Sequence, residues 1–344
     1  MSDFTCLQII WFGLLGVLFI AYALLDGFDL GVGSCLVHFK NDRSRRLALN
    51  AIGPVWDGNE VWLLGAGGAL FAAFPHVYAG VFSGLYTALI LLLGVLIFRA
   101  VAIEIRSKVE SPRWRGFWDW AFCVTSTLIA LLLGVALGNL VTGVPVDAAG
   151  NVDAGWLGLF GLLEPIPLFS GVLAVCLLRL HGTLFLMAKT SDPEMRFEIL
   201  LRLPKEFAAT AIFYIALTAW VLFGDVAGTE NFRTFPWLGA FPIIAILSLV
   251  ATGIFLRLQT LKLAFAGTSL TIAFLILTVG AGLFPNLVPA DVAENSLTIA
   301  DSASEKTLLI MFVVALLGVP LVLVYHFLVY RTFAPKTTLD ENSY

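Results

Sequence analysis

Residues 7–32 read LQIIWFGLLGVLFIAYALLDGFDLGV, and this stretch decides the fold class. Its first charged side chain is Asp26, so an apolar run of nearly full membrane length precedes it. A helix needs about 20 mainly apolar residues to cross a hydrocarbon core of roughly 30 Å, because each residue rises about 1.5 Å. The run is too long for the apolar region of a signal peptide and ends without a small-residue cleavage site. We therefore expect residues 7–32 to form a membrane-spanning helix of the mature protein.

The whole chain has the composition of a membrane protein. Of its 344 residues, 59% are hydrophobic and 13% are charged, whereas about a quarter of the residues in soluble domains are charged. This much apolar surface exceeds what one core in water could bury, which excludes a soluble globular enzyme, a disordered chain and a secreted disulfide scaffold. The net charge is −4 and the Lys and Arg residues form no basic stripe, so we expect no nucleic-acid partner.

Nine stretches are long and apolar enough to span a membrane. They cover residues 7–32, 50–74, 77–103, 116–140, 166–188, 206–227, 236–256, 261–284 and 306–330. No connecting loop is long enough for a separate soluble domain, so the sequence predicts an all-α integral membrane protein with one polytopic domain over residues 1–344. Spans one to four and five to eight begin on the same side. This favours two four-helix bundles, in residues 1–140 and 166–284, plus one peripheral helix at 306–330.

The positive charges predict the orientation of the chain. If the N-terminus is outside, the inward-facing loops, helix ends and tail hold 17 of the 20 Lys and Arg residues, including Arg99 at the end of the third span. The outward-facing loops hold Arg233 and Lys306, and Arg179 lies within a span. Short loops rich in Lys and Arg stay on the cytoplasmic side. The N-terminus is therefore predicted outside and the C-terminus in the cytoplasm.

Four acidic residues lie in the first two spans. Asp26 and Asp29 are three residues apart, as are Asp57 and Glu60, so each pair lies on one face of a helix. An ionisable side chain in the bilayer costs about 2.5–3.5 kcal/mol on insertion scales and is expected to face a partner, a cavity or a subunit interface. We expect Asp57 and Glu60 to lie deeper in the membrane than Asp26 and Asp29. The four acids together indicate a protonatable track open to the cytoplasm.

An alternative interpretation gives the first acid pair a structural role. Asp26 and Asp29 would then lie at the level of the lipid headgroups and cap the end of the first span. Their charges would be neutralised by an arginine of the following segment, which offers Arg43, Arg45 and Arg46.

The fifth and ninth spans carry further polar residues. Arg179 and His181 form a candidate buried polar pair, and His326 lies at a similar depth. As axial ligands, His181 and His326 would bridge two helices through a haem iron. In the alternative, each histidine forms hydrogen bonds within the bundle while Arg179 neutralises one of the acids. The cysteines lie far apart and match no metal-binding spacing, so we expect no metal site.

Several motifs resemble those of one known family, subunit II of the cytochrome bd quinol oxidases. The resemblance rests first on DGFDLGVG at residues 26–33, WDGNEVWL at 56–63 and GAGGALFA at 65–72. It continues through shorter motifs: RSK at 106–108, RWR at 113–115, WDW at 118–120, GNL at 138–140, GVP at 143–145, FP at 284–285, SLT at 296–298 and AS at 303–304. The likeness therefore extends over nearly the whole chain.

The resemblance implies a multi-pass subunit of a respiratory complex in the bacterial plasma membrane. The partners it implies are a haem-carrying subunit I, a small single-helix subunit, membrane lipid, and quinol and oxygen through the complex. Haems b and d are expected in the partner, whereas this chain is expected to bind no cofactor firmly; some members of the family are associated with a quinone bound in this subunit. Asp57 matches the acid of the family's cytoplasmic proton path. Trp62, with Trp56, is expected at the oxygen entrance or the subunit interface.

These observations leave three hypotheses for the function. In the first, Asp57, Glu60, Asp29 and Asp26 pass cytoplasmic protons to the partner subunit, where oxygen is reduced to water. In the second, the chain is a scaffold that stabilises the haem-bearing subunit and its acids are silent. The third is an autonomous proton-coupled transporter, for which nine spans and buried acids would also serve.

Overall fold

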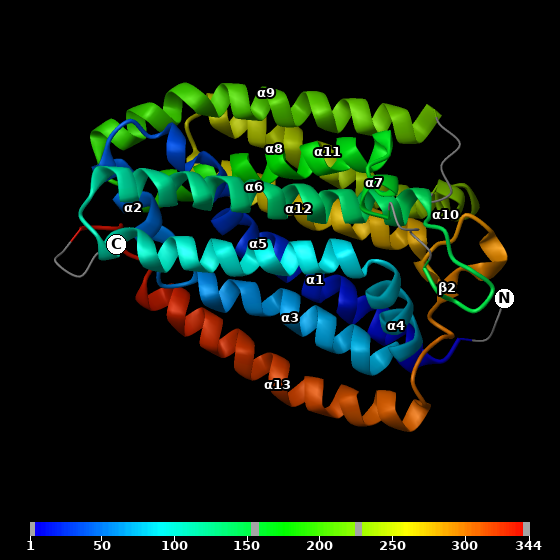
Figure 1. Cartoon of the computed structure of the whole chain (residues 1–344). Coiled ribbons are helices and arrows are strands. Elements are labelled where there is room, and N and C mark those ends of the chain that lie inside the picture. The colour runs from blue at the N-terminus through cyan, green and yellow to red at the C-terminus, as the bar shows by residue number, and fades with distance from the viewer. Residues whose placement is uncertain (1–3, 153–157, 224–228, 340–344) are drawn as a thin grey trace.

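Long apolar runs fold into long helices, because in lipid the backbone must satisfy its N–H and C=O groups within the segment. The computed structural model describes residues 4–152, 158–223 and 229–339 and shows these runs as parallel and antiparallel helices (Figure 1). In chain order the helices are α1 (Cys6–Cys35), α2 (Asp42–Ile52), α3 (Trp56–Ala73), α4 (Pro75–Gly84), α5 (Tyr86–Ile105), α6 (Pro112–Thr142), α7 (Gly158–Gly161), α8 (Pro165–Lys189), α9 (Pro193–Phe223), α10 (Glu230–Thr234), α11 (Ala240–Arg257), α12 (Leu261–Leu283) and α13 (Glu305–Thr332).

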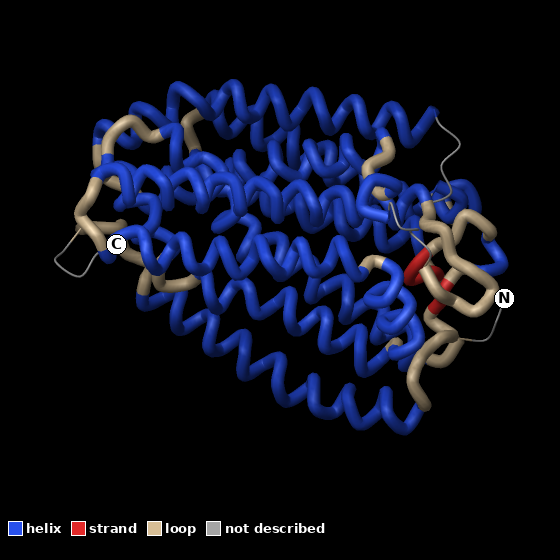
Figure 2. Tube along the Cα trace, in the orientation of Figure 1, coloured by secondary structure: helices blue, strands red, loops and turns tan. Residues whose placement is uncertain are grey.

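The predicted all-α membrane fold is confirmed. Among the described residues, eight helices are long and apolar enough to cross a membrane, and a ninth span is formed if the bent pair α3 and α4 is counted as one. In the part of the chain that the structure describes, strand is confined to β1 (Asn286–Val288) and β2 (Leu297–Thr298), which pair antiparallel at one end of the bundle (Figure 2).

The second and third spans have different boundaries from those predicted. The helix α3 begins at Trp56 rather than at residue 50, because residues 50–52 are the end of α2 and residues 53–55 form the turn between the two helices. At its other end the chain bends by 120° into α4, whose first residue is Pro75. Proline cannot donate the hydrogen bond that would continue α3. The predicted span 77–103 is divided at Leu85: its first part lies in α4, and the rest is α5, which is long and apolar enough to cross the membrane by itself.

The sixth span, in contrast to the second, begins earlier than predicted. The helix α9 starts at Pro193, whereas the apolar run alone indicated residue 206. The added turns are polar but anchored: Arg196 donates hydrogen bonds to the carbonyls of Met187 and Thr190, and Glu198 pairs with Arg202 at i and i+4. Hydropathy cannot detect such an extension, because it scores only the apolar part. The predicted end of this span, residues 224–227, lies outside the described residues.

Glycine allows α1 and α8 to cross at the centre of the bundle. A Cβ atom on Gly31 would lie 2.0 Å from the carbonyl oxygen of Leu178, and one on Gly182 would lie 2.5 Å from the backbone nitrogen of Val32. Both clashes are with backbone atoms, which cannot rotate away. The helix α8 also packs on α6, α9 and α12, so it joins the helices of residues 1–140 to those of residues 166–284. The division of the chain into these two groups remains a prediction.

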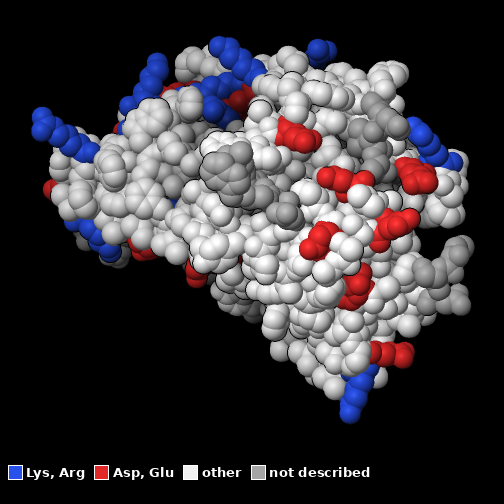
Figure 3. Space-filling model, turned by 45° about the vertical axis from the view of Figure 1, so that its right-hand side comes forward, with Lys and Arg blue, Asp and Glu red and all other residues white. Residues whose placement is uncertain are grey.

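The two ends of the bundle carry opposite charge. The end that holds α2, residues 106–111 and the C-terminal residues up to 339 is named the basic end, and the other end, with β1 and β2, the acidic end. Among the described residues, the exposed acids at the acidic end are Asp147, Glu164, Glu230, Asp291, Glu294 and Glu305, and acidic side chains gather on this face in Figure 3. This separation supports the predicted orientation, with the basic end in the cytoplasm.

Candidate functional site

A buried ion pair joins α1 to α5. Asp26 and Arg99 are both fully buried, and the guanidinium donates two hydrogen bonds, of 2.6 and 3.2 Å, to the carboxylate. A two-pronged contact of this kind fixes geometry as well as charge. The predicted partners Arg43, Arg45 and Arg46 are wrong for Asp26, because it lies more than two helical turns before the end of α1 while all three arginines lie on α2.

The second acid of α1 is held by an amide rather than a cation. Asp29 is fully buried, and its Oδ2 accepts a 2.7 Å hydrogen bond from Nδ2 of Asn59 on α3. The Oδ1 atom of Asp29 has no hydrogen-bond partner among the described residues. A carboxylate with one oxygen bonded and the other free can take up a proton without losing an existing contact.

The two acids of α3, Asp57 and Glu60, are less buried than Asp26 and Asp29. Glu60 has a side chain that is 21% exposed and lies 3.6 Å from Arg99, which it shares with Asp26. Asp57, in the first turn of α3, is exposed. The greater membrane depth predicted for Asp57 and Glu60 is not reflected in their burial within the chain, because both are more exposed than Asp26 and Asp29. Burial instead increases from Asp57 through Glu60 to the acids of α1.

The structure adds three residues to the predicted acids. Arg99 was expected on the cytoplasmic side but is fully buried; a charge inside the apolar run of residues 86–105 was the available signal. Asn59 lies between the two acids of α3 and is also fully buried. Tyr330 of α13 donates a 2.7 Å hydrogen bond to Oδ1 of Asn59. No pattern in the sequence pairs Tyr330 with α3, since the two are separated by most of the chain.

The two tryptophans of α3 are buried in the isolated chain. Trp56 is 8% exposed and Trp62 is 6% exposed, and Nε1 of Trp62 donates a 3.1 Å hydrogen bond to Nε2 of His326 on α13. An indole can only donate, so Nε2 of His326 is the acceptor and its Nδ1, 3.0 Å from the carbonyl oxygen of Val322, carries the proton. Both ring nitrogens of His326 thus have protein partners in this conformation.

The candidate pair Arg179 and His181 is not formed, because residues two apart on a helix do not face each other. Arg179 instead contacts Glu206 of α9, with 3.0 Å between Nε and Oε1. His181 is fully buried; its Nδ1 lies 2.8 Å from the Thr268 hydroxyl and its Nε2 3.3 Å from the Leu24 carbonyl oxygen. The hydrogen-bonded alternative describes His181 better than the haem alternative does. The expectation that Arg179 neutralises an acid of the first two spans is wrong.

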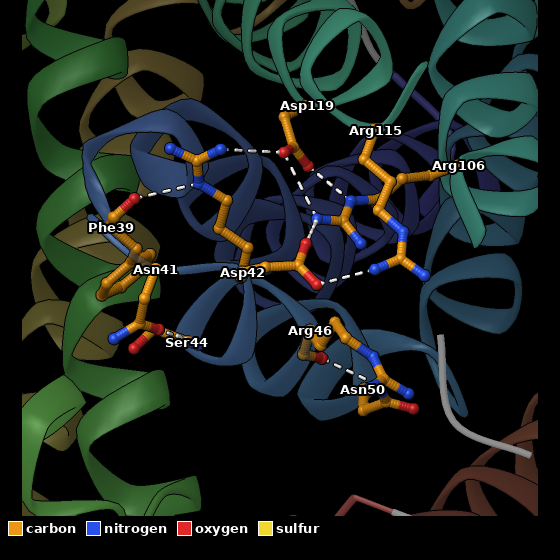
Figure 4. Close-up of polar contacts among 10 residues, drawn as sticks. Phe39, Asn41, Asp42, Ser44, Arg46, Asn50, Arg106, Arg115 and Asp119 are labelled. Atoms are coloured by element: carbon orange, nitrogen blue, oxygen red, sulfur yellow. Dashed lines mark hydrogen bonds and ion pairs between the residues drawn. The ribbon is translucent and has the colours of Figure 1, made fainter. Parts of the chain in front are cut away.

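A second ion network closes the basic end (Figure 4). Arg106 lies between two acids, 2.6 Å from Asp42 and 2.5 Å from Asp119. Arg45 adds a 3.1 Å contact to Asp119, and Arg115 adds a 2.9 Å contact to Asp42. Because Asp42 begins α2 and Asp119 lies on α6, this network ties α2 to the bundle. Its acids are all paired with arginines, unlike Asp29.

The pKa of Asp42 leads to a prediction about pH. Burial alone would raise this pKa, but the hydrogen bond from Arg106 and the charges of Arg106, Arg115 and Arg46 outweigh it and hold the pKa below its usual value of 3.8. Such a carboxylate stabilises the fold above its usual pKa, and the contribution is lost as the pH falls through the lowered pKa. We expect Asp42→Asn to lower the melting temperature at neutral pH, with a difference from the unmodified protein that closes below pH 3.8.

Thermal unfolding in detergent across this pH range measures the effect. The matched control is Glu110→Gln, at an exposed acid of the same end. A difference for Asp42→Asn that stays constant with pH would contradict the assignment.

Comparison with known families matches residues 7–333 to the family described as cytochrome bd terminal oxidase subunit II. The chain belongs to this family. It is therefore a multi-pass subunit of a bd-type oxidase, an oxidoreductase complex of the bacterial plasma membrane, and family membership implies a partner subunit I.

Individual relatives agree with the family match. The chain is 38% identical over 358 residues to cytochrome bd-I ubiquinol oxidase subunit 2 of Escherichia coli strain K12, covering 94% of this chain and 93% of the relative. It is 31% identical over 346 residues to cytochrome bd ubiquinol oxidase subunit 2 of Bacillus subtilis, covering 96% and 97%. A solved structure of bd oxidase from Geobacillus thermodenitrificans matches with a TM-score of 0.76 at 19% identity, covering 96% of this chain and 99% of that chain, which supports the fold.

Proposed function

We propose that this chain stabilises the haem-bearing subunit and supplies it with cytoplasmic protons for the reduction of oxygen to water. The relatives named above are subunits of ubiquinol oxidases. In such a complex the haems b and d, placed by this proposal in the partner, carry electrons from quinol to oxygen. The role of this chain is to hold and move protons through its own carboxylates.

One observation carries the proposal: acids of increasing burial follow one another from the surface into the bundle. Asp57 is exposed, Glu60 is partly exposed, and Asp29 is fully buried with a free carboxylate oxygen. Burial of this kind is expensive unless the group is paired or functional. Among the four acids, as far as the structure describes their contacts, Asp29 is the fully buried one whose hydrogen-bond partner is an amide and not a cation, whereas Arg99 pairs with Asp26 and lies near Glu60.

The position of the acids fits the chemistry of the complex. Asp57 begins α3 near the basic end, which is the predicted cytoplasmic side. Protons taken up there are removed from the cytoplasm when the partner consumes them. Protons released from quinol near the other face would pass to the outer side of the membrane. This separation of charge builds a proton-motive force without a pump.

The proposal predicts the effect of neutralising Asp57. In the intact complex, Asp57→Asn is expected to slow oxygen consumption by about 10²-fold, the lower end of the range of 10²–10⁴ that a positioned proton-transfer group contributes. The reduced-minus-oxidised haem spectrum should remain unchanged, since Asp57 is exposed and replacing it removes no buried contact. Oxygen consumption per haem is the measurement, with Glu110→Gln as the control.

The scaffold alternative makes the opposite prediction. If the acids are silent, variants at Asp57, Glu60 or Asp29 lose the complex and its haem before they lose turnover per haem. Normal turnover in a fully assembled Asp57→Asn complex would contradict the proton path and leave only the stabilising role. The oxidase family match argues against the third hypothesis, an autonomous transporter.

The oxygen entrance or subunit interface remains part of the proposal. Its support is the face of α3 beside Trp62, where Val61 is 52% exposed and Leu64 is 70% exposed. On the same helix, Cβ atoms added at Gly65 and Gly68 would meet nothing within 4 Å. A helix of subunit I, or of a small single-helix subunit, could approach such a surface closely.

A bound quinone is also part of the proposal. A groove of about 430 Å³ lies between α1 and α12, lined by Phe12, Gly13 and Gly16 on α1 and by Gly280 on α12, with Trp237 nearby. Nothing lies within 4 Å of a Cβ atom added at any of these glycines, so the missing side chains leave apolar space suited to an isoprenoid tail. Extraction and quantification of quinone from the purified complex would test this part.

A further inference from the structure

The helix α13 lies at the edge of the bundle but reaches the buried acids. Leu308 is its one buried residue among those described, and its other side chains are partly or fully exposed. Towards its basic end, two side-chain hydrogen bonds connect it to α3. One runs from Tyr330 to Asn59, at 2.7 Å, and the other from Trp62 to His326, at 3.1 Å. An otherwise loosely packed helix is therefore fastened to α3 by polar contacts.

The amide of Asn59 has a partner for every atom that can bond. Its Nδ2 donates to Oδ2 of Asp29, at 2.7 Å, and to the carbonyl oxygen of Leu25, at 3.2 Å. Its Oδ1 accepts from the hydroxyl of Tyr330. An amide has two donors on one side and an acceptor on the other, so these three partners permit one orientation and disfavour its flip. With the amide flipped, Oδ1 would face both the carboxylate of Asp29 and the carbonyl of Leu25.

We propose that Tyr330 is a positioning residue for Asp29 and acts through Asn59. By holding the acceptor side of the amide, the Tyr330 hydroxyl keeps the donor side on Oδ2 of Asp29 and leaves Oδ1 as the atom that takes the proton. This inference rests on the proposed proton path, because it assigns the orientation of one acid in that path. It gives α13, remote from the acids in sequence, a direct part in proton transfer.

Other charged groups also act on Asp29. They are Asp26 on the same helix, Glu60 on α3 and Arg99 on α5; the hydroxyl of Tyr330 on α13 is titratable and also interacts with Asp29. Asp26, Glu60 and Arg99 are all unchanged in a Tyr330→Phe variant. The variant keeps the ring and removes only the hydroxyl, so a change in the behaviour of Asp29 reports the loss of the Asn59 contact.

Infrared difference spectroscopy of the intact complex tests the inference. The carboxyl band of Asp29 is assigned by its loss in Asp29→Asn. In Tyr330→Phe we expect this band to move, and the pH at which it titrates to change by about one unit, the size expected from one hydrogen bond to an ionised group. The pH profile of oxygen consumption should move by the same amount. The control is Tyr325→Phe, at a ring 57% exposed on the same helix, which should change neither.

The outcomes separate the inference from the function on which it rests. If the band and its titration in Tyr330→Phe equal those of the unmodified complex, the positioning role is wrong. If Asp29→Asn turns over normally, the proton path fails at Asp29, whereas a shifted band in Tyr330→Phe would still show the positioning contact. Should Tyr330→Phe fail to assemble, Asn59→Ala removes the same link and must shift the band at least as far. An unmoved band in that variant would also overturn the inference.

Discussion

An Arg99→Met variant is expected to lose most of the assembled complex. Arg99 is fully buried and gives Asp26 two hydrogen bonds, so its removal leaves a carboxylate in the bundle without a counter-charge. Breaking a buried ion pair in this way costs about 3–5 kcal/mol, a large fraction of the roughly 5–15 kcal/mol that stabilises a typical domain. The yield of haem-containing complex and its melting temperature in detergent measure the effect.

A double variant distinguishes the effect of the unpaired Asp26 charge from the effect of losing the Arg99 side chain. Replacing both partners, in Asp26→Leu with Arg99→Met, should recover most of the stability, because an apolar pair of similar volume can replace a buried ion pair at little cost. Arg43→Met is the matched control, since its side chain is 67% exposed and its contact with Asp192 lies at the surface. An Arg99→Met complex as stable as the unmodified one would contradict the stabilising role assigned to this ion pair.

Gly31→Val is expected to be the most disruptive substitution on α1. The first atom of the new side chain would lie 2.0 Å from the carbonyl oxygen of Leu178 and 2.9 Å from Cα of Gly182. Real contacts of this kind are essentially never so short, so α1 and α8 would have to separate. Overpacking costs about 1–3 kcal/mol in tolerant cores and more where backbone must move. Loss of the folded chain from the membrane, measured by its yield after mild solubilisation, is the expected result.

The same helix provides the control for this substitution. A Cβ atom on Gly16 would meet nothing within 4 Å, so Gly16→Val adds the same side chain to α1 without a clash. It should accumulate normally. Equal yields for Gly31→Val and Gly16→Val would mean that the crossing of α1 and α8 tolerates a wider separation than the structure shows.

Much of the fold could be predicted from the sequence because lipid imposes a simple rule. A run of about 20 apolar residues must be helical, so each predicted span has a matching helix. The predicted helix boundaries were wrong where turns or side-chain contacts, and not hydropathy, determine where a helix begins or ends. A turn that contains Pro54 separates α2 from α3 within the second span, and the third span is divided at Leu85 between α4 and α5. The polar start of α9 is held by side-chain contacts that an apolar score cannot detect.

The candidate site could be predicted only in part. Charge inside an apolar run is visible in the sequence, and it led to Asp26, Asp29, Asp57 and Glu60. The partners of these acids depend on how helices meet, which a single sequence does not contain. The pairing of Asp26 with Arg99 joins helices that lie far apart in the chain, and the contact between Asn59 and Tyr330 spans 271 positions.

The contact of Tyr330 has a consequence for biosynthesis. Ribosomes make the chain from its N-terminus, so Asn59 enters the membrane long before the residue that fixes its amide. Until the final helix has been inserted, the polar centre of the nascent protein is incomplete. A message truncated before codon 305 would therefore yield every other helix of the bundle around an unfinished centre, a natural substrate for membrane proteases.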